Sequence, residues 1–404
     1  MKALILCPRI PFPPDDGGSI AMVQLQKGLQ EAGVRTDVLA FNTTKHYISP
    51  SSIDADYSAE TRLETVDLDN RVKPIPALIQ LLKGESYHIS RFDSPQFHHA
   101  LQRKLKEEQV DFVLLESLSM APYLPCIRAH SSSPVVLRAH NVEHQIWHKL
   151  AQKSLNPVRK AYLNILSRQL REFECRNLNA VDGIAAIAEP DASLFRQLAP
   201  QTPVCVIPTG LKVPPQPIET GHSEFPVVAH LGAMNWMPNL EGIEWFLAKV
   251  WPKVLDKNQS ITLRLAGKHM PEKLLGMNKP GFEIRGFVDD ASAFLGQADI
   301  LVVPLLSGSG MRIKIAEGMA LGKAIVTTRQ GCEGIDAKNG REILLADSPE
   351  DFATCILQLA EDQTLRRELG SSAQQFANEH FSSQKITQDF IRFVQGLGLA
   401  KVGN

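Results

Sequence analysis

Short apolar runs alternate with longer amphipathic stretches along the whole chain. In the first half these runs are apolar at consecutive positions, which is typical of parallel strands that are buried on both faces. They cover residues 3–7, 36–41, 111–116, 134–139, 183–188 and 204–207. The stretches between them have helical periodicity, so this half predicts a parallel α/β sheet with helical crossovers.

A proline-rich stretch, 208–217, interrupts the alternation, and prolines do not occupy central strands. Beyond it the strand-like runs resume at 226–232, 261–267, 282–286, 299–305, 324–328 and 342–346. We therefore predict two Rossmann-like domains, 1–207 and 223–382, joined by a linker at 208–222. Residues 383–404 form an amphipathic C-terminal helix that is a candidate to cross back to the first domain.

The length of the chain agrees with this division into two domains. The chain has 404 residues, and single cores stop growing at roughly 250–300 residues. Its 44% hydrophobic and 22% charged residues are typical of a soluble globular protein. The net charge of −1 provides no overall basic field, which argues against a nucleic-acid partner. Any bound anion must therefore be held locally.

The cysteines and the apolar runs indicate a cytoplasmic protein. The six cysteines form no Cys-x-x-Cys pair, which argues against a zinc ribbon or a disulfide framework. Pro8 and Arg9 break the first apolar run before it could serve as a signal-peptide core. No run approaches the roughly 20 apolar residues that a membrane helix needs.

The loop after the run 299–305 is the most informative segment for chemistry. Gly308 and Gly310 allow close approach of a ligand, and Ser309 is the predicted N-cap of a helix whose free N–H groups would bind an anion. Arg312 and Lys314 follow at the predicted helix start, where a cation opposes the helix dipole. A bound diphosphate would offset that cost, whereas the alternative is a pair of solvated charges.

Glu317 lies one turn further along the same predicted helix. Its carboxylate could accept both hydroxyls of a ribose diol, or it could form an i,i+3 salt bridge with Lys314. At 100° per residue, Arg312 and Lys314 would point about 200° apart on a regular helix. Both cations can reach one phosphate group only if the first turn is irregular.

Residues 308–322 resemble the donor-binding segment of the retaining family-four, or group 1, glycosyltransferases of GT-B fold. In that family a Glu-x7-Glu signature closes the nucleotide-sugar site: the second Glu grips the ribose and the first contacts the sugar. Glu317 matches the second Glu, whereas Ser309 stands at the position of the first. The chain here resembles a branch that reads Gly-x-Gly-x-Arg-x-Lys, in which backbone N–H groups would replace the first carboxylate.

Four further segments resemble the family, each at the end of a predicted strand. They are similar to the N-terminal glycine loop near the donor phosphates or acceptor (11–19), the interdomain turn (207–210), the strand that opens the second domain (230–239) and the loop beside the base (284–290). The resemblance thus adds as candidate nucleotide-sugar-binding residues Gly17, Gly18, Gly232, Gly286 and Val288.

The resemblance implies a GT-B enzyme with two doubly wound parallel-sheet domains facing a central cleft. It would move a sugar from a nucleoside diphosphate sugar to a hydroxyl acceptor with retention, in cell-surface polysaccharide or glycolipid synthesis. The 308–310 backbone, Arg312 and Lys314 would stabilise the leaving diphosphate, so no metal or other cofactor is expected. The acceptor would be an unidentified glycan or lipid-linked molecule.

His140 follows the predicted strand 134–139. The resemblance implies a histidine beside the donor sugar at this strand end, so His140 joins Glu317 as a catalytic candidate. His140, Glu143 and His144 also fit the His-x-x-Glu-His pattern of zinc peptidases. That pattern needs both histidines inside one helix, whereas His140 is expected in a turn, so a zinc peptidase is the more remote alternative.

Other interpretations remain at this stage. A nucleotide-sugar epimerase of the same fold and a non-catalytic nucleotide-sugar binder fit the same residues. Two Asp-x-Asp patterns, 54–56 and 67–69, suggest a metal motif of another glycosyltransferase fold, but their polar surroundings predict surface loops. The basic amphipathic helix expected at 157–176 is either a packed surface helix or a contact with the inner face of a membrane.

Overall fold

The computed structural model describes residues 1–14, 16–218, 226–277, 281–308 and 311–402. The chain divides into two compact units, Met1–Gly210 with Ile386–Asn404 (unit 1) and Leu211–Lys385 (unit 2). The boundary between the two units thus falls after Gly210, within the predicted linker 208–222. Residues 219–222 of that linker lie outside the described residues.

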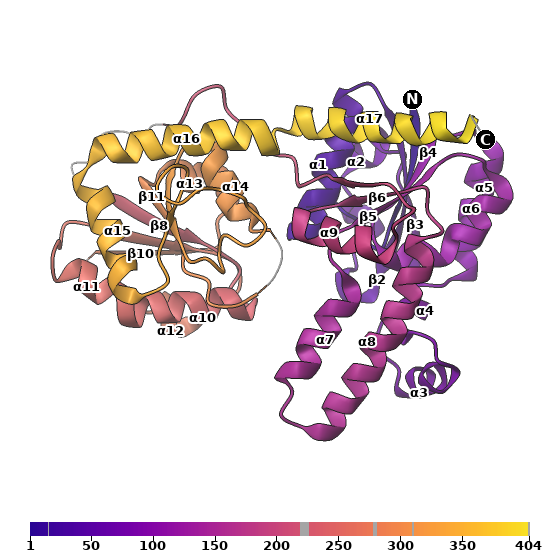
Figure 1. Cartoon of the computed structure of the whole chain (residues 1–404), viewed down its shortest axis with the longest axis horizontal. Coiled ribbons are helices and arrows are strands. Elements are labelled where there is room, and N and C mark those ends of the chain that lie inside the picture. Colours follow the sequence, from indigo (N-terminus) through magenta and orange to yellow (C-terminus); the bar gives the residue numbers. More distant parts are fainter. Residues whose placement is uncertain (15, 219–225, 278–280, 309–310, 403–404) are drawn as a thin grey trace. The chain divides into compact units, whose positions relative to one another are not determined.

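Unit 1 contains a seven-stranded parallel sheet in the order β3-β2-β1-β4-β5-β6-β7 (Figure 1). Its strands are β1 (Lys2–Cys7), β2 (Arg35–Thr43), β3 (Glu64–Leu68), β4 (Phe112–Leu115), β5 (Val135–Ala139), β6 (Gly183–Ala186) and β7 (Val204–Val206). The six predicted runs are confirmed, and β3 was missed.

The two acidic segments expected as loops in unit 1 belong to regular elements. Asp54 accepts a hydrogen bond from the Tyr57 N–H and so caps a short helix that begins at Ala55. Asp67 lies within β3, at the edge of the sheet. The loop prediction was wrong at both places because polar residues suit a helix cap and a half-buried edge strand as well as a turn.

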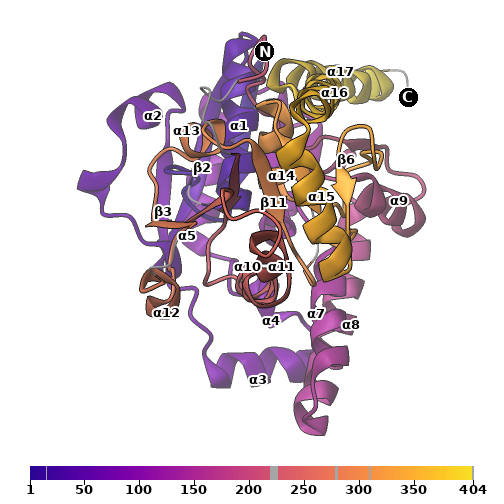
Figure 2. The same ribbon diagram turned by 90° about the vertical axis from the view of Figure 1, so that its left-hand side faces the viewer.

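Helices cover both faces of this sheet (Figures 1 and 2). The α-helices of unit 1 are α1 (Gly17–Glu31), α2 (Ala55–Glu60), α3 (Pro74–Lys83), α4 (Tyr87–Ser90), α5 (Pro95–Glu107), α6 (Leu124–His130), α7 (Glu143–Lys153), α8 (Pro157–Leu178), α9 (Glu189–Leu198) and α17 (Ser383–Val402). Short 3-10 helices occupy Thr44–His46, Pro50–Ser52 and Leu118–Tyr123. The helix expected at 157–176 is confirmed as α8.

Alternate residues of β1 supply the two apolar cores of unit 1. Leu4 and Leu6 join the core under α5, α6, α8 and α9, whereas Ile5 joins the opposite core under α1 and α17. Within that second core, the rings of Phe112 on β4 and Phe390 on α17 meet edge to face at 5.8 Å. The C-terminal helix is thus an integral part of unit 1, since it covers one face of the sheet.

Unit 2 contains a six-stranded parallel sheet in the order β10-β9-β8-β11-β12-β13. Its strands are β8 (Val227–Leu231), β9 (Thr262–Ala266), β10 (Phe282–Gly286), β11 (Ile300–Val303), β12 (Ala324–Thr327) and β13 (Leu344–Leu345). Its α-helices are α10 (Met237–Trp245), α11 (Trp251–Leu255), α12 (Glu272–Leu275), α13 (Ala291–Gly296), α14 (Ile313–Ala320), α15 (Pro349–Glu361) and α16 (Gln363–Phe381), with a π-helical turn at Phe246–Val250. All six predicted runs are confirmed.

The strand order reverses once in each sheet, between β1 and β4 in unit 1 and between β8 and β11 in unit 2. Ligands of doubly wound sheets bind outside the carboxyl ends of the strands at such a switch point. The segments after β8 and β11 therefore deserve the closest inspection in unit 2. None of the described helices is both long enough and apolar enough to cross a membrane.

Candidate functional site

Lys314 occupies the switch point of unit 2. Its Nζ donates a hydrogen bond of 2.7 Å to Oδ1 of the buried Asn239 on α10, and Asn239 in turn donates 2.9 Å to the carbonyl of Ala233. A Cβ atom on Gly232, directly after β8, would lie 2.8 Å from Lys314 Nζ. Glycine at position 232 therefore makes room for the ammonium group.

Burial and, to a smaller extent, the positive charge of Arg312 lower the pKa of Lys314 to about 7, and the negative charge of Glu317 opposes this shift. A lysine with such a pKa becomes fully charged when an anion arrives beside it. Within the described part of the chain, only Asn239 receives a hydrogen bond from this ammonium, which leaves two N–H groups for that anion.

Arg312 stands at the N-cap position of α14, with extended backbone angles (φ −90°, ψ 95°). The predicted N-cap, Ser309, was wrong because the helix begins only at Ile313; Ser309 and Gly310 themselves lie outside the described residues. The buried guanidinium of Arg312 packs 5.3 Å from the ring centroid of Trp236. Its burial lowers the pKa of Arg312, and Glu333, whose carboxylate lies 3.9 Å from Nη2, opposes that shift.

Gly308 lies in the same loop and has a left-handed backbone (φ +112°). A Cβ there would lie 3.0 Å from Arg312 Nη2 and 3.1 Å from the Trp236 ring, so the position requires glycine on two grounds. The 200° separation calculated for a regular helix does not apply to Arg312 and Lys314, because only Lys314 belongs to α14.

Glu317 lies one turn beyond Lys314 and is half-buried. Burial raises its pKa to about 7, and the positive charge of Lys314 opposes that rise. Among the described residues, no hydrogen bond or ion pair holds the Glu317 carboxylate, and the alternative salt bridge is not formed because Lys314 binds Asn239. Glu317 is thus an acceptor available to a ligand.

Sequence reasoning missed the side chains that support this cluster. Asn239 and Trp236 lie in the segment 230–239, which was singled out only for its glycine. Gln330, in the loop after β12, donates to the carbonyl of Gly308 (3.0 Å) and to Glu333 (2.9 Å). Gln330 and Glu333 follow β12, a third parallel strand whose carboxyl end lies at the same edge of the sheet. That position is the signal that could have identified them.

Gly286 and Val288 lie at the carboxyl end of β10. Gly286 is the last residue of that strand, and its carbonyl accepts a 2.7 Å hydrogen bond from the N–H of Gly267. The Val288 side chain packs against the apolar core of unit 2. The exposed side chain here is Phe287, with Lys268 Nζ 5.4 Å from its ring centroid.

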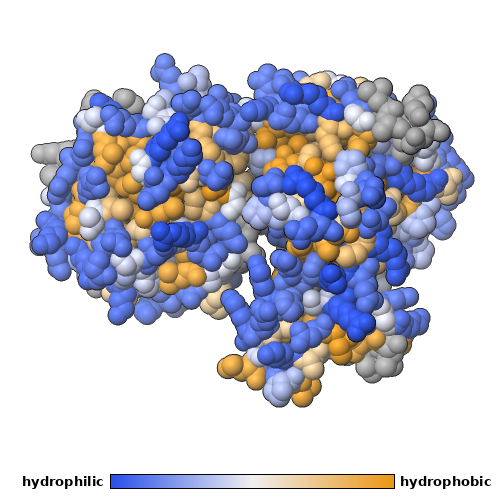
Figure 3. All heavy atoms as spheres, viewed as in Figure 1, coloured by the Kyte–Doolittle hydropathy of each residue, from blue (hydrophilic) through white to orange (hydrophobic). Residues whose placement is uncertain are grey.

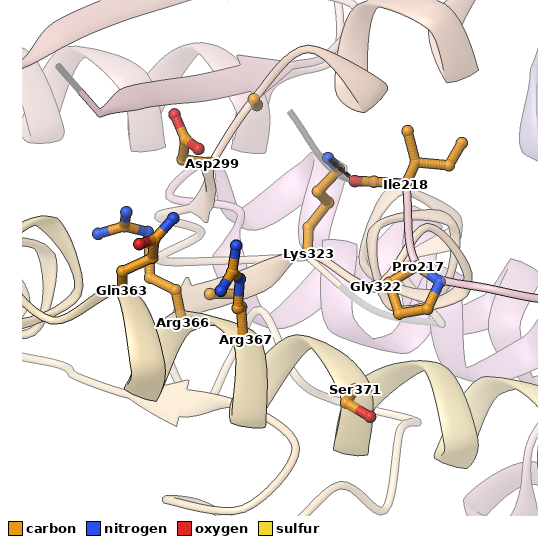
Figure 4. Close-up of a pocket in the computed structure, with 11 residues that line it drawn as sticks. Pro217, Ile218, Asp299, Gly322, Lys323, Gln363, Arg366, Arg367 and Ser371 are labelled. Atoms are coloured by element: carbon orange, nitrogen blue, oxygen red, sulfur yellow. Dashed lines mark hydrogen bonds between the residues drawn. The ribbon is translucent and has the colours of Figure 1, made fainter. Parts of the chain in front are cut away.

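A separate cavity of about 230 Å³ lies in unit 2, lined in part by Asp299, Lys323 and Arg366 (Figure 4). Asp299 and Lys323 directly precede β11 and β12, so this cavity lies at the amino ends of the strands. Lys323 Nζ donates 2.7 Å hydrogen bonds to the carbonyls of Ile218 and Gly296. The cavity therefore lies at the amino ends of the strands, whereas Gly232 and Lys314 lie at their carboxyl ends.

The equivalent edge of unit 1 holds His140. Its Nε2 lies 3.0 Å from Oε2 of Glu116, a buried carboxylate that follows β4. Nη1 of Arg138 lies 3.3 Å from the other oxygen of Glu116 and donates 2.8 Å to the carbonyl of Ala21. Burial opposes ionisation of Glu116, but the charges of Arg138 and His140 prevail and lower its pKa. A buried anion thus fixes the orientation of His140.

Gly17 and Gly18, expected in a loop, form the first turn of α1 instead. Asp16 caps this helix by accepting a 3.0 Å hydrogen bond from the N–H of Ser19, whose hydroxyl accepts from the N–H of Asp16 at the same distance. Burial opposes ionisation of Asp16, but the hydrogen bond from Arg9 lowers its pKa. The correction follows from this capping box, which the glycine pattern concealed.

The His-x-x-Glu-His pattern does not converge on a common point. His140 lies before α7, whereas His144 lies inside it and its Nδ1 is 2.5 Å from Oε2 of Glu174 on α8. The same carboxylate accepts hydrogen bonds from the N–H groups of Glu143 (3.0 Å) and His144 (3.3 Å). In the described part of the chain, no three His, Cys, Asp or Glu side chains gather as metal ligands do.

Two doubly wound parallel sheets in one chain, one with cations and a carboxylate at its switch point, are typical of the GT-B class of glycosyltransferases. Two family models match the chain: "Glycosyltransferase Family 4" over residues 16–213 and "Glycosyl transferases group 1" over residues 225–362. The chain therefore belongs to the group 1, or family 4, glycosyltransferases, and both the resemblance and the predicted GT-B fold class are confirmed.

Curated relatives match parts of the chain. An "Uncharacterized 44.6 kDa protein in cps region" of Klebsiella pneumoniae is 26% identical over 39% of this chain and 43% of its own length. An uncharacterized glycosyltransferase of Methanocaldococcus jannaschii is 30% identical over 33% of each chain. The chain thus matches less than half the length of these relatives.

Solved structures match the fold over nearly the whole chain. Anabaena HepE in complex with UDP superimposes with a TM-score of 0.67 at 14% identity, covering 98% of this chain and 100% of that one. Sucrose-phosphate synthase of Thermosynechococcus elongatus gives a TM-score of 0.69 at 15% identity, covering 99% and 100%. A Staphylococcus aureus TarM mutant in complex with UDP and alpha-GlcNAc-glycerol, among other ligands, gives 0.65 at 12%, covering 98% and 100%.

Proposed function

We propose that this chain transfers a sugar from a nucleoside diphosphate sugar to a hydroxyl group of a glycan or lipid-linked acceptor. The observation that carries the proposal is the grouping of Arg312, Lys314 and Glu317 around the start of α14, at the switch point of unit 2. Two cations, and one carboxylate that has no partner among the described residues, match the two polar parts of a nucleoside diphosphate: its diphosphate and its ribose.

The cations would stabilise the diphosphate as it leaves. As far as the described residues show, Lys314 retains two N–H donors for phosphate oxygens. Arg312 stands directly before the N–H groups of the first turn of α14. Donors that are already oriented towards developing negative charge lower the barrier to departure without reorganising. We propose that they neutralise the diphosphate without a metal ion.

The remaining contacts would identify the nucleoside. The Glu317 carboxylate would accept hydrogen bonds from the ribose diol, and the segment from Gly286 to Val288 would lie beside the base. UDP is the first nucleotide to test, because the titles of the HepE and TarM structures name UDP.

In unit 1, His140 is the residue that would contact the donor sugar, held in orientation by Glu116. We also propose retention at the anomeric carbon, an expectation that rests on family membership. The Klebsiella relative is described as lying in a cps region, and this supports a role in cell-surface polysaccharide or glycolipid synthesis. Such a role would place the protein in the cytoplasm, at the inner face of the membrane.

A ligand screen by thermal unfolding tests the donor site. UDP, GDP, ADP, TDP and CDP are compared, since a ligand at 100 times its Kd stabilises a protein by about 2.7 kcal/mol. One nucleotide is expected to stabilise the wild type, and Arg312→Ala and Glu317→Ala to reduce that shift. Arg392→Ala, on the exposed surface of α17, is the matched control. An unchanged shift in both site variants would refute the assignment.

Product analysis then separates the possible reactions. Incubation of the bound UDP-sugar without acceptor leaves the sugar unchanged in a transferase and changes it in an epimerase. Incubation with acceptor extracts yields a glycosylated product from a transferase and none from a binding protein. The anomeric configuration of that product, measured by NMR, decides between retention and inversion.

A further inference from the structure

The antiparallel pair α7 and α8 projects from unit 1 (Figure 1). The turn that joins the two helices carries exposed apolar side chains. Leu155, in the turn itself, is 100% exposed, and Val158 is 78% exposed. The remaining large apolar side chains exposed on these two helices are Leu150, Tyr162 and Ile165. Exposure of several large apolar side chains to water is unfavourable, which indicates that another surface covers the turn.

Helix α3 contributes to the same surface. Gln169 on α8 donates a 3.1 Å hydrogen bond to the carbonyl of Leu81 on α3, which fixes the two helices to each other. Ile75 on α3 is 74% exposed, and Val72 and Ile79 are exposed beside it. Figure 3 shows several apolar patches among hydrophilic surface in the part of unit 1 that contains α3 and the ends of α7 and α8. We call the exposed apolar residues of α7, of α8, of the turn between them and of the segment 72–79 the hairpin surface.

The charge on the hairpin surface is mainly positive. Acidic residues at its margin pair with three of the cations: Glu172 with Arg168, and Asp69 with Arg71 and Lys73. Residues 144–171 contain no Asp or Glu and six basic residues, which are Lys149, Lys153, Arg159, Lys160, Arg168 and Arg171. Residues 71–83 contain three Lys or Arg and again no acidic residue. Since the whole chain has a net charge of −1, this cationic excess is local.

An anionic lipid bilayer fits this combination. Apolar side chains enter the boundary between headgroups and acyl chains to a depth of about 5–10 Å, while Lys and Arg beside them meet lipid phosphates. Tyrosine favours the same boundary, where Tyr162 would lie. A second copy of this chain fits less well, because it would bring the same six positive charges against these.

We propose that the hairpin surface binds the headgroup region of an anionic membrane, with Leu155 and Val158 inserted. The inference deepens the proposed function, because membrane binding would hold unit 1 where a lipid-linked acceptor lies. Only this biological role rests on the proposed function. Membrane binding itself requires neither donor nor turnover. The two proposals can therefore fail separately.

Vesicle flotation of the full chain tests the inference. The protein is expected to float with vesicles of phosphatidylcholine and phosphatidylglycerol, and not with phosphatidylcholine alone. Binding should weaken as salt rises, because the Debye length falls from roughly 10 Å at 0.1 M to 3 Å at 1 M. Equal binding to both vesicle types, or none to either, would overturn the proposal.

Two pairs of variants assign the binding to this surface. Leu155→Glu should abolish flotation, whereas Leu275→Glu, at an exposed position of unit 2, should not. The double variant Lys153→Gln and Lys160→Gln should lose about fivefold in affinity per charge removed. The control, Lys257→Gln with Lys273→Gln, makes the same change in net charge on unit 2.

The remaining outcomes are informative. An unchanged UDP-induced thermal shift in Leu155→Glu verifies that this variant is folded. Flotation that survives both hairpin variants would overturn the proposal. So would a dimer in gel filtration that Leu155→Glu disperses, because the hairpin surface would then join two copies. Flotation without any nucleotide binding would leave this inference standing and refute the proposed function.

Discussion

Lys314 Nζ occupies the space that a side chain on Gly232 would take: a Cβ there would lie 2.8 Å from it. The two residues belong to segments that follow different strands, β11 and β8, and the sheet order brings those strands together. Asn239 closes the arrangement, since its Nδ2 would lie 2.9 Å from the same Cβ. A one-carbon change at Gly232 therefore acts on the ammonium group.

Gly232→Ala is expected to weaken UDP binding about 10- to 100-fold, the range that corresponds to one lost charge-assisted hydrogen bond. The methyl group must displace Lys314, Asn239 or both from the positions that leave two N–H donors for phosphate. Calorimetric titration with UDP measures the loss. Gly396→Ala is the matched control, because its Cβ meets nothing within 4 Å on α17; an equal loss there would contradict the assignment.

The depressed pKa of Lys314 predicts that UDP binding takes up a proton. Above pH 7, where the free protein holds Lys314 largely neutral, the diphosphate must restore its charge. UDP affinity should then fall by up to about tenfold per pH unit as pH rises from 7. Calorimetry at pH 8 in buffers of different ionisation enthalpy measures the uptake directly.

Lys314→Arg is the matched variant for this pH dependence. An arginine keeps its charge throughout the range, so the proton uptake should vanish while binding is partly retained. Lys314→Met should lose both. If the fall in affinity persists in Lys314→Arg, a group other than Lys314 carries the titration. Glu317 would act in the opposite direction: its pKa is raised to about 7, and its ionised form is the one that accepts from the ribose, so its titration would raise affinity with pH.

The sequence predicted the strands of both sheets well because parallel strands buried on both faces are apolar throughout. It missed β3, an edge strand in which polar Glu64, Thr65 and Asp67 alternate with apolar residues. Capping was predicted less well. Ser309 is a good N-cap by residue type, but α14 begins later, where Arg312 lies extended against Trp236.

The site was predictable only as far as local sequence reaches. Arg312, Lys314 and Glu317 lie within six consecutive residues, and their chemistry could be proposed from that spacing. The partners Asn239 and Glu333 lie on segments that follow other strands, so only the strand order brings them close. Contacts of this kind depend on topology, which periodicity does not supply.

The ribose contact of Glu317 predicts discrimination between UDP and 2′-deoxy-UDP. The wild type should prefer UDP by about 10-fold or more, since hydrogen bonds to a charged acceptor contribute about 1.5–3 kcal/mol. In Glu317→Ala this preference should fall to near unity, because the deleted carboxylate no longer distinguishes the two. Competition titrations give both affinities. Glu244→Ala, at an exposed position on α10, should keep the preference.

His140 is expected to affect turnover and not nucleotide binding. His140→Ala should lower the rate of sugar transfer by about 100-fold or more, the scale typical of a group acting at a reaction centre. The Kd for UDP should stay within about twofold, because the nucleotide residues belong to unit 2. His98→Ala, at a partly exposed position, is the control. A change confined to Kd would exclude the proposed role.

Glu116→Gln tests whether the buried carboxylate positions His140. The amide keeps the size of the side chain but removes the charge that lies 3.0 Å from the imidazole. We expect the transfer rate to fall and UDP binding to persist, as in His140→Ala. In the double variant the two losses should not add, because both act through the same imidazole. Additive losses would mean that Glu116 acts elsewhere.

His144 and Glu174 are expected to stabilise unit 1 and not to hold a metal. Glu174→Ala removes the acceptor of two N–H groups and of the His144 imidazole at once, and should lower the free energy of unfolding by about 2–4 kcal/mol. Glu172→Ala, on the same helix but exposed, should change it by less than about 1 kcal/mol. Urea unfolding measures both. Metal analysis of the purified wild type supplies the opposing outcome: stoichiometric zinc that disappears in His144→Ala would restore the peptidase interpretation.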